Sequence, residues 1–556
     1  MRRDEKRTWM CGVVVGAAAL VGVSSFAGPI PGALAADGAP DPAPPGVASL
    51  NPALAPFENQ PVRWHECRTG PNDAIGSYLD AAGAQCAGIS VPLDYARPDG
   101  REITLGVSRI RAADTAHRRG ILMINLGGPG GPALDATLDL RGLLGEAADG
   151  FDVVGMDPRF VGRSAPLDCG PILKRPWPRA GGPDQDSFDR TADGQAAIAQ
   201  ACAVHADVLP FASTRNTARD MDIVRAALDE RKTSFLGFSY GTYLGAVYMQ
   251  MFPDRVDRFV LDSVVDPTTY NPRVLRDTGD LLEGALREWA GWAAGRDAQF
   301  GLGSTAAEVL ATVDRIYAAA ARGPLTVDGV EYDAGDIPGL LMDALVDDSA
   351  EASDILAMGV RAFADAADGR APAENPYLDE FLDGVATGGP TLPGGSPGRR
   401  VEAVPEGSIS AFQSAQLAVL CGDVPASRVA GEYLADIRRH QRAQPHVGAA
   451  IWNLTPCTFW PVRPVEAPTR VANAVPALVV AAEKDNRTPY AGSRALHRAL
   501  SSSRLVTLRG ARVHGVYGGR SGCVDDAVNA YLRSGTLPSA DLTCTRPPAP
   551  PGSLPE

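Results

Sequence analysis

Lysine is almost absent from this 556-residue sequence, and basic residues are fewer than acidic ones, with 52 Lys and Arg against 66 Asp and Glu. The formal net charge is −14. A chain of this sign is repelled by phosphate backbones and by anionic membrane surfaces. We therefore expect no nucleic acid partner and no binding to a membrane surface.

Long apolar runs are also missing, apart from one near the N-terminus at about residues 9–23. It follows a basic segment and precedes the small-residue pattern Ala33-Leu34-Ala35, an order that is typical of a secretory signal peptide and its cleavage site. We predict a signal peptide at residues 1–35 and a flexible leader or propeptide at 36–60. The mature protein is expected to be secreted and extracellular, with no membrane contact after signal removal.

Metal-binding patterns are a third absence, because the sequence has no CxxC pair and no cluster of Cys and His. Removal of Cys11 with the signal peptide leaves eight cysteines, and an even number in an exported chain indicates disulfide bonds. Sequence does not determine how they pair. The simplest hypothesis joins neighbours along the chain: Cys67 with Cys86, Cys169 with Cys202, Cys421 with Cys457, and Cys523 with Cys544.

The chain does contain a series of short apolar runs of strand length, separated by helical stretches. Such runs are typical of strands buried on both faces, and their alternation with helices predicts a doubly wound, mostly parallel α/β sheet. We assign the first part of this core to residues 61–270 and the second part to 466–545. The clearest runs are residues 121–125, 151–157, 233–238, 258–262, 477–482 and 504–508.

Between the two parts of the core, from residue 271 to 465, the strand pattern lapses. Amphipathic helical stretches lie at residues 281–294, 306–321 and 355–367, and Gly- and Pro-rich links separate them. We predict a helical cap insertion over the carboxyl ends of the strands, where open α/β sheets bind their ligands. Residues 546–556 are predicted to be a flexible tail.

One motif in the core carries chemistry: Gly237-Phe238-Ser239-Tyr240-Gly241, between an apolar strand and a helical stretch. The G-x-S-x-G pattern in this context predicts a sharp strand-to-helix turn that exposes the serine hydroxyl at a helix N-terminus. Bulky side chains at either glycine would collide with the turn. We therefore predict that Ser239 is a catalytic nucleophile.

A serine nucleophile needs a base and a carboxylate that orients the base. With the serine on such a turn, the expected order along the chain is Ser, acid, His. His514 follows the last buried run and is the predicted base, in preference to His446 and His497. Two acids are candidates: Asp485 directly follows the run 477–482, and Asp262 ends the run 258–262. We favour Asp485 because it leaves room for the insertion, and we interpret the nearby Glu483 as a solvated residue.

The reaction also needs backbone amides that stabilise the oxyanion of the tetrahedral intermediate. The loop Leu126-Gly127-Gly128-Pro129-Gly130-Gly131 follows a buried run and can supply one donor, Gly128, while Tyr240 supplies the other. A phosphate-binding loop is the alternative. However, the loop lacks both the G-K-[ST] ending and the G-x-G-x-x-G spacing of nucleotide-binding proteins.

Together these motifs resemble the secreted tripeptidyl aminopeptidases of actinomycetes, which are α/β-hydrolase serine exopeptidases related to prolyl aminopeptidases. The resemblance spans about residues 64–544. It implies an α/β-hydrolase fold and a serine aminopeptidase activity. The segments that carry it are 125–131, 157–159, 237–242, 261–267, Asp485 with Thr488-Pro489, His514-Gly515 and 457–461.

The predicted function is a secreted serine exopeptidase that releases short peptides, tripeptides by the resemblance, from free N-termini of peptides or proteins, without metal or organic cofactor. A carboxylesterase or lipase with the same Ser239, His514 and Asp485 is the nearest alternative. A non-catalytic binding protein on a hydrolase scaffold is another. Acidic side chains of the insertion are available for the substrate ammonium, although we favour a solvated acidic face for them: Asp343, Asp347, Asp348, Glu351 and Asp354.

Overall fold

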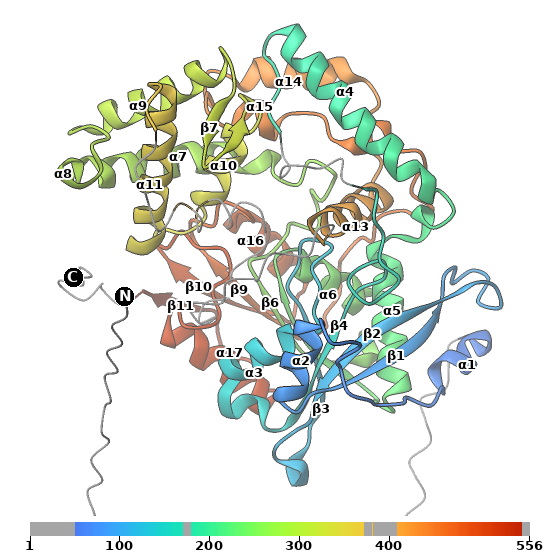
Figure 1. The fold of residues 1–556 in the computed structure, drawn as a ribbon. Helices are drawn as coiled ribbons and strands as arrows, with labels where there is room; N and C mark the ends of the chain where they lie inside the picture. The colour runs from blue at the N-terminus through green and yellow to red at the C-terminus, as the bar shows by residue number, and fades with distance from the viewer. Residues whose placement is uncertain (1–50, 171–178, 372–377, 379–380, 382–407, 547–556) are drawn as a thin grey trace, which may run out of the picture. The chain divides into compact units, whose positions relative to one another are not determined.

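The computed structural model describes residues 51–170, 179–371, 378, 381 and 408–546. A nine-stranded sheet crosses the core in the order β1-β2-β4-β3-β5-β6-β9-β10-β11 (Figure 1). β2 pairs antiparallel with β1 and β4, and every other neighbouring pair is parallel. The strands are β1 (Gln85–Pro92), β2 (Glu102–Ile110), β3 (Gly120–Asn125), β4 (Phe151–Met156), β5 (Thr233–Phe238), β6 (Val256–Asp262), β9 (Leu478–Ala482), β10 (Arg504–Arg509) and β11 (Leu542–Thr545).

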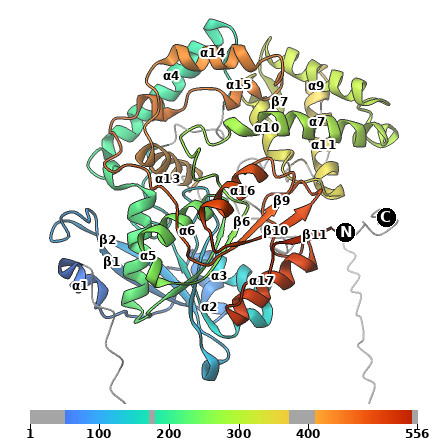
Figure 2. The same ribbon diagram turned by 180° about the vertical axis from the view of Figure 1, so that it is seen from behind.

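Helices cover both faces of this sheet, which explains why its central strands are apolar throughout. In β3, Ile121 and Met123 join one hydrophobic cluster, whereas Leu122 and Ile124 join another on the opposite face. Figures 1 and 2 show the sheet and its covering helices from opposite sides. This arrangement confirms the predicted doubly wound, mostly parallel α/β fold. One face is covered by α5 (Thr214–Ala227), α6 (Tyr240–Met251) and α16 (Tyr490–Ala499), and the other by α3 (Ala136–Leu144) and α17 (Gly522–Ser534).

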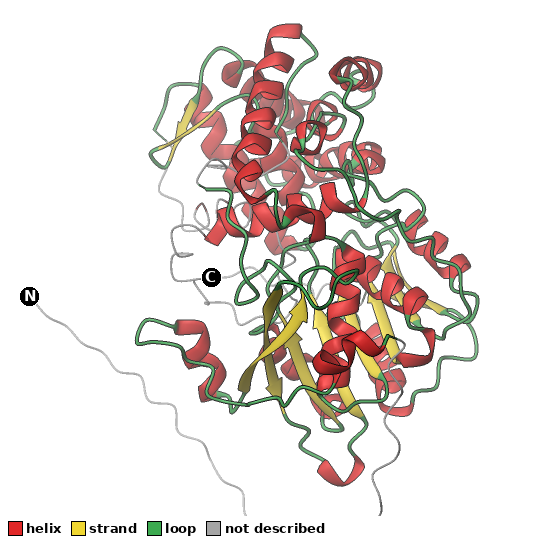
Figure 3. Ribbon diagram, turned by 90° about the vertical axis from the view of Figure 1, so that its right-hand side faces the viewer, coloured by secondary structure: helices red, strands yellow, loops and turns green. Residues whose placement is uncertain are grey.

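A second group of helices forms a layer beyond the strand ends (Figure 3). Its helices have one apolar face each, and Leu286, Val313, Leu341 and Leu356 meet in a core separate from that of the sheet. Among the described residues, none of the helices has the length and apolarity needed to cross a bilayer. The layer contains α7 (Gly279–Ala294), α8 (Asp297–Phe300), α9 (Ala306–Ala320), β7 (Leu325–Val327), β8 (Val330–Tyr332), α10 (Ile337–Ala344), α11 (Ala350–Ala367) and α15 (Gly448–Ile451).

Helix α4 (Gln185–Cys202), from the chain before the nucleophile, packs in two places. Its Phe188 is buried with Tyr433 and Ile437 of α14 (Ala430–His440), whereas Ile198, Ala199 and Cys202 near its end join the hydrophobic cluster of the sheet. Residues 61–270 are predicted from sequence to belong to the core as one block, which does not foresee the contact with α14. An amphipathic helix buries its apolar face wherever a matching face lies, and the sequence pattern does not say which one that is.

Four disulfide bonds join the eight cysteines of the described chain, each to its neighbour in sequence. The Cα atoms of the pairs lie 4.7–5.8 Å apart, and 19 to 36 residues separate the two cysteines. Cys421–Cys457 joins α13 (Ser408–Asp423) to the segment that leads back to the core. The pairs are Cys67–Cys86, Cys169–Cys202, Cys421–Cys457 and Cys523–Cys544.

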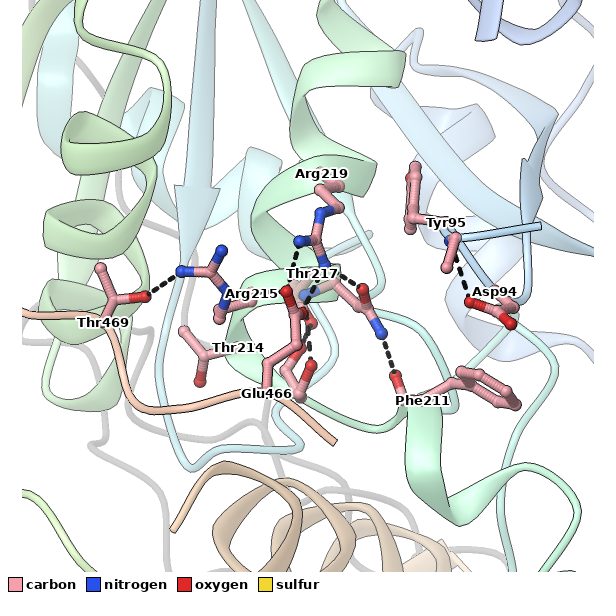
Figure 4. Close-up of polar contacts among 12 residues, drawn as sticks. Asp94, Tyr95, Phe211, Thr214, Arg215, Thr217, Arg219, Glu466 and Thr469 are labelled. Carbon is pink, nitrogen blue, oxygen red and sulfur yellow. Dashed lines mark hydrogen bonds and ion pairs between the residues drawn. The ribbon is translucent and has the colours of Figure 1, made fainter. Parts of the chain in front are cut away.

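The segment that returns from the helical layer to β9 is held by the first turns of α5 (Figure 4). Arg219 donates two hydrogen bonds of 2.7 Å to the carboxylate of Glu466, and Arg215 donates one of 2.8 Å to Thr469 Oγ1. The hydrogen bonds from Arg219 keep the pKa of Glu466 below its usual value. These contacts hold residues 466–469 against α5, shortly before the chain enters β9, where pairing with β6 and β10 places the strand that precedes Asp485.

Candidate active site

Ser239 is the single residue between β5 and α6, at the carboxyl end of a central strand. Its backbone has φ 54° and ψ −124°, a conformation that costs a non-glycine residue about 1–3 kcal/mol. Although Ser239 occupies the position before the first residue of α6, its hydroxyl does not cap the helix. The predicted sharp strand-to-helix turn is therefore present, with the hydroxyl left uncommitted to the backbone.

The two glycines of the motif are required by close backbone contacts. A Cβ atom on Gly237 would lie 2.6 Å from the carbonyl oxygen of Gly241, and one on Gly241 would lie 2.5 Å from the carbonyl oxygen of Asn125. Contacts below 3.0 Å to backbone atoms cannot be relieved by a side-chain rotation. The steric reason given for the motif from sequence thus applies in the folded chain.

Asp485 and His514 are brought together from two loops, after β9 and after β10. His514 Nδ1 lies 2.9 Å from Asp485 Oδ2, and the Asp485 side chain is 1% exposed. Asp485 Oδ1 accepts the amides of Arg487 and Thr488 at 2.8 and 2.9 Å, which fixes the carboxylate in its loop. The other oxygen is thereby directed to the imidazole.

Thr488 is a residue of this site that sequence reasoning missed. Its hydroxyl donates to Asp485 Oδ2 at 2.9 Å and lies 3.3 Å from His514 Nδ1. The sequence marked Thr488 only by its place three residues after Asp485 and as part of a segment that carries the family resemblance, without a role at the site. That spacing lets a side chain fold back onto the carboxylate that its own amide already contacts.

The loop of His514 is tied to the strand end beside Ser239. The amide of Ser239 donates to the backbone oxygen of Asp262 at 3.0 Å, while the amides of Val516 and Tyr517 donate to the Asp262 carboxylate. Gly515 N donates to Ser263 Oγ at 2.8 Å. Among the residues that the structure describes, no hydrogen bond joins the Ser239 hydroxyl to His514. In free enzymes such bonds are often long and tighten when substrate binds.

Asp262, the second candidate acid, has a different place in the structure. Its carboxylate accepts the Tyr517 amide at 2.7 Å and the Ser263 hydroxyl at 3.0 Å, and it contacts the backbone after His514 rather than the imidazole. Burial raises the pKa of Asp262 to about 7. The geometry therefore favours Asp485 as the partner of His514, and Asp262 anchors the loop.

The raised pKa of Asp262 predicts a pH dependence of stability. The folded chain keeps a proton on Asp262 that the unfolded chain releases near pH 4, so this group makes stability fall as pH rises from about 4 to 7. In Asp262→Asn this contribution is absent. In urea titrations we compare the free energy of unfolding of the variant with that of the unaltered protein at each pH. The difference, variant minus unaltered protein, is expected to grow by on the order of 2–4 kcal/mol from pH 4 to pH 7.5. Parallel pH profiles for the two proteins would contradict this.

The other two histidines considered as bases have partners elsewhere. His446 lies in the helical layer between Glu283 and Asp314, with nitrogen-to-oxygen distances of 2.9 and 3.1 Å. Burial lowers the pKa of His446, but the hydrogen bonds that the imidazole donates to these carboxylates, together with their charges, outweigh burial and raise it. His497 Nδ1 lies 2.7 Å from Ser503 Oγ at the far end of α16. Glu483 accepts the amide of Gly510 at 2.8 Å on the surface.

The glycine-rich loop after β3 lies against the start of α6. A Cβ atom on Gly127 would lie 3.1 Å from the amide nitrogen of Tyr240. The Gly127 amide already donates to Asn125 Oδ1 at 3.0 Å, whereas the amides of Gly128 and Tyr240 have no acceptor among the described residues. The two amides that were predicted to bind an oxyanion are thus among those of this loop and turn that have no acceptor in the described part of the chain.

Helix α13 of the insertion rests directly on this loop. Gln416 Nε2 donates to the carbonyl oxygen of Gly128 at 3.2 Å, and a Cβ atom on Gly130 would lie 2.8 Å from the Phe412 carbonyl oxygen. At the other end of α13, Asp423 accepts the Thr214 hydroxyl at 2.5 Å, and Thr214 Oγ1 lies 2.6 Å from the Tyr240 hydroxyl. The insertion therefore contacts the loop directly and is linked to the residue after Ser239 through Thr214 of α5.

The acidic residues proposed for the substrate ammonium mostly have partners within the chain. Asp343 pairs with Arg487, and Asp347 pairs with Arg520 at 2.7 Å. Asp348 pairs with Arg546 at 2.5 Å. Within the described part of the chain, no group of three or more His, Cys, Asp or Glu side chains is arranged to hold a metal ion.

Comparison with known proteins agrees with this fold. A family model described as alpha/beta hydrolase fold matches residues 121–354, and one described as TAP-like protein matches residues 445–544. The chain is a serine peptidase of the α/β-hydrolase type.

The curated relatives give the family. The tripeptidyl aminopeptidase of Streptomyces lividans is 34% identical over 476 residues, which cover 83% of each chain. The serine protease Hip1 of Mycobacterium tuberculosis is 30% identical over 521 residues, or 88% of this chain and 92% of Hip1. A carboxylesterase B of the same organism is 30% identical over an alignment of 563 positions that covers 94% of this chain and 96% of the esterase. The chain belongs to the tripeptidyl aminopeptidase family and is a serine aminopeptidase, as its motifs predicted.

Proposed function

We propose that the protein is a secreted exopeptidase that releases tripeptides from free N-termini through an acyl-enzyme on Ser239. The observation that carries the proposal is the 2.9 Å contact between His514 Nδ1 and Asp485 Oδ2, in a loop tied to the strand end beside the Ser239 turn. Tripeptide release is supported by the name of the Streptomyces lividans relative. Export is supported by the N-terminal sequence and by four disulfide bonds.

In the proposed mechanism, His514 takes the proton of the Ser239 hydroxyl as Ser239 attacks the scissile carbonyl. Asp485 holds the imidazole in the tautomer with its proton on Nδ1, and stabilises the imidazolium that forms. The amides of Gly128 and Tyr240 donate to the oxyanion. Each such donor contributes about 3–4 kcal/mol to transition-state stabilisation in related chemistry. His514 then gives the proton to the leaving amine, which departs and leaves the tripeptide as an ester on Ser239. Water, deprotonated by His514, attacks this ester, and the tripeptide leaves with a free carboxylate while the proton returns to Ser239 Oγ.

Substrate length is the part of the proposal that an assay tests most directly. Mature protein is incubated with tripeptidyl, dipeptidyl and aminoacyl chromogenic amides, and with the same tripeptidyl amide acetylated at its N-terminus. We expect cleavage of the tripeptidyl amide, and a kcat/KM at least about 100-fold lower for the acetylated substrate, because an ammonium bound to a buried site is lost. Equal cleavage of the acetylated substrate would overturn the exopeptidase proposal.

An esterase is the second candidate, because the carboxylesterase relative covers nearly the whole chain. Short-chain p-nitrophenyl esters distinguish the two, since the same nucleophile can attack either carbonyl. Cleavage of the esters together with no cleavage of any peptidyl amide would favour the esterase. Failure of a fluorophosphonate to label Ser239 in folded protein would favour a binding protein that has no catalysis.

A further inference from the structure

The segment that joins α10 to α11 lies against both loops that carry the proposed acid and base. It runs from Asp343 to Asp348 in the helical layer, more than 130 residues before Asp485 in the chain. Its three aspartates were expected to meet a substrate or solvent. Instead, each of them pairs with an arginine from the carboxyl-terminal part of the core: Asp343 with Arg487, Asp347 with Arg520, and Asp348 with Arg546.

The loop of Asp485 contacts this segment through the two residues that follow the acid. Asn486, which is fully buried, donates from Nδ2 to the carbonyl oxygen of Leu345 at 2.7 Å. Arg487 pairs with Asp343, and the two side chains are only 17% and 14% exposed. The residues one and two positions after Asp485 are therefore both fixed to the insertion.

The loop of His514 is held by the same segment. Arg512 donates its amide to Asp348 Oδ2 at 2.9 Å, and its carbonyl oxygen accepts the Asp348 amide at 2.9 Å. Its guanidinium, which is buried, donates to the carbonyl oxygens of Leu345 and Asp347 at 2.5 and 3.2 Å. Arg512 precedes His514 by two residues, so these bonds control the path of the backbone into the imidazole.

A single carbonyl group thus accepts hydrogen bonds from both loops. Leu345 O receives Asn486 Nδ2 and Arg512 Nη1, one from each side of the contact between Asp485 and His514. Hydrogen bonds to charged donors that are removed from water are among the stronger ones in proteins. Because a bond of 2.9 Å tolerates little displacement, the spacing of the two loops decides whether the acid orients the base.

We propose that Asp343–Asp348 is a positioning element for the acid and base, with Asp348 as its main positioning residue. The proposal rests on the proposed function, in which Asp485 orients His514. It also assigns these carboxylates a role other than binding the substrate ammonium. Asp347 and Asp348 each accept a backbone amide in addition to an arginine, and Asp343 already has its arginine partner.

The test combines two variants in the mature protein. Asp348→Ala removes the acceptor for the Arg512 amide, and Asp348→Asn keeps one oxygen that can accept it. We expect kcat for a tripeptidyl amide to fall about 10- to 100-fold in Asp348→Ala, with KM unchanged within twofold and a smaller loss in Asp348→Asn. Asp333→Asn is the matched control, because Asp333 also pairs with an arginine, Arg179, but at the other end of α10 and with 54% of its side chain exposed.

The decisive measurement repeats Asp348→Ala in an Asp485→Asn background. If Asp348 acts through the acid and base, the second substitution lowers kcat less than about threefold there, because the pair no longer functions. The proposal would be overturned if the kcat loss in the double variant equalled the product of the losses in the two single variants. A raised KM with unchanged kcat in Asp348→Ala, or full activity of this variant in folded form, would overturn it as well. Full activity of Asp485→Asn alone would instead overturn the proposed function.

Discussion

Replacing Ser239 with alanine is expected to lower kcat for a tripeptidyl amide by about 10⁵- to 10⁶-fold, to the level left by substrate binding and the oxyanion donors. The alanine has no nucleophile at the strained turn, where φ is 54°. His514→Ala is expected to cause a loss of the same size, and the double variant no further loss, because the two residues act as one unit. Steady-state rates with a tripeptidyl amide, checked by fluorophosphonate labelling, measure this.

His497→Ala is the control for the histidine. His497 lies in the last turn of α16, and its imidazole contacts Ser503, which follows the helix, rather than the loop of His514. Activity of the variant should therefore stay within about twofold of the unaltered protein. Substantial activity in folded Ser239→Ala would contradict a serine nucleophile at this position. The same loss in His497→Ala as in His514→Ala would contradict the assignment of the base.

Replacing Asp220 with alanine is expected to destabilise the fold by about 3–5 kcal/mol. Arg159 and Asp220 form an ion pair in which both side chains are fully buried, with nitrogen-to-oxygen distances of 2.7 and 2.6 Å. The Tyr95 hydroxyl donates to the same carboxylate at 2.7 Å. The alanine leaves a guanidinium buried without its counter-charge, which costs more than the lost attraction alone. Urea titrations of the mature protein at pH 7 measure the change.

Asp207→Ala is the matched control, because Arg101 and Asp207 form an ion pair of 2.8 Å in which the side chains are 59% and 64% exposed. Exposed pairs contribute about 0–1 kcal/mol. The double replacement Arg159→Met and Asp220→Leu should recover much of the stability lost in Asp220→Ala, because no charge is then left unpaired. Equal effects of Asp220→Ala and Asp207→Ala would contradict the role assigned to burial.

Much of the core could be predicted from the chain alone, because its signals are local. Continuous apolar runs at residues 121–125 and 477–482 predicted strands covered on both faces, and β3 and β9 are such strands. The turn at Ser239 could also be predicted. Its two glycines are required by backbone atoms that the motif itself and the neighbouring strand bring close.

Other features had no local signal. The packing of the first part of α4 depends on the apolar face of α14, more than 200 residues further along the chain. The roles of Asp343, Asp347 and Asp348 depend on arginines that the folding of the insertion brings opposite them. The sequence of an acidic stretch does not indicate whether its carboxylates face solvent, a ligand or arginines of the same protein.

The sequence by itself determined the parallel sheet, the strained serine turn and the three residue types that a serine hydrolase needs, because hydrophobic period and backbone sterics act within a few residues. Only the tertiary structure decided which carboxylate meets His514. Asp262 ends a buried strand and Asp485 follows one, and the sequence favoured Asp485 only because it leaves room for the insertion. Packing gave Asp262 to the amides of Val516 and Tyr517, and left Asp485 Oδ2 for the imidazole, because each oxygen of a buried carboxylate binds the donors that the fold places within reach.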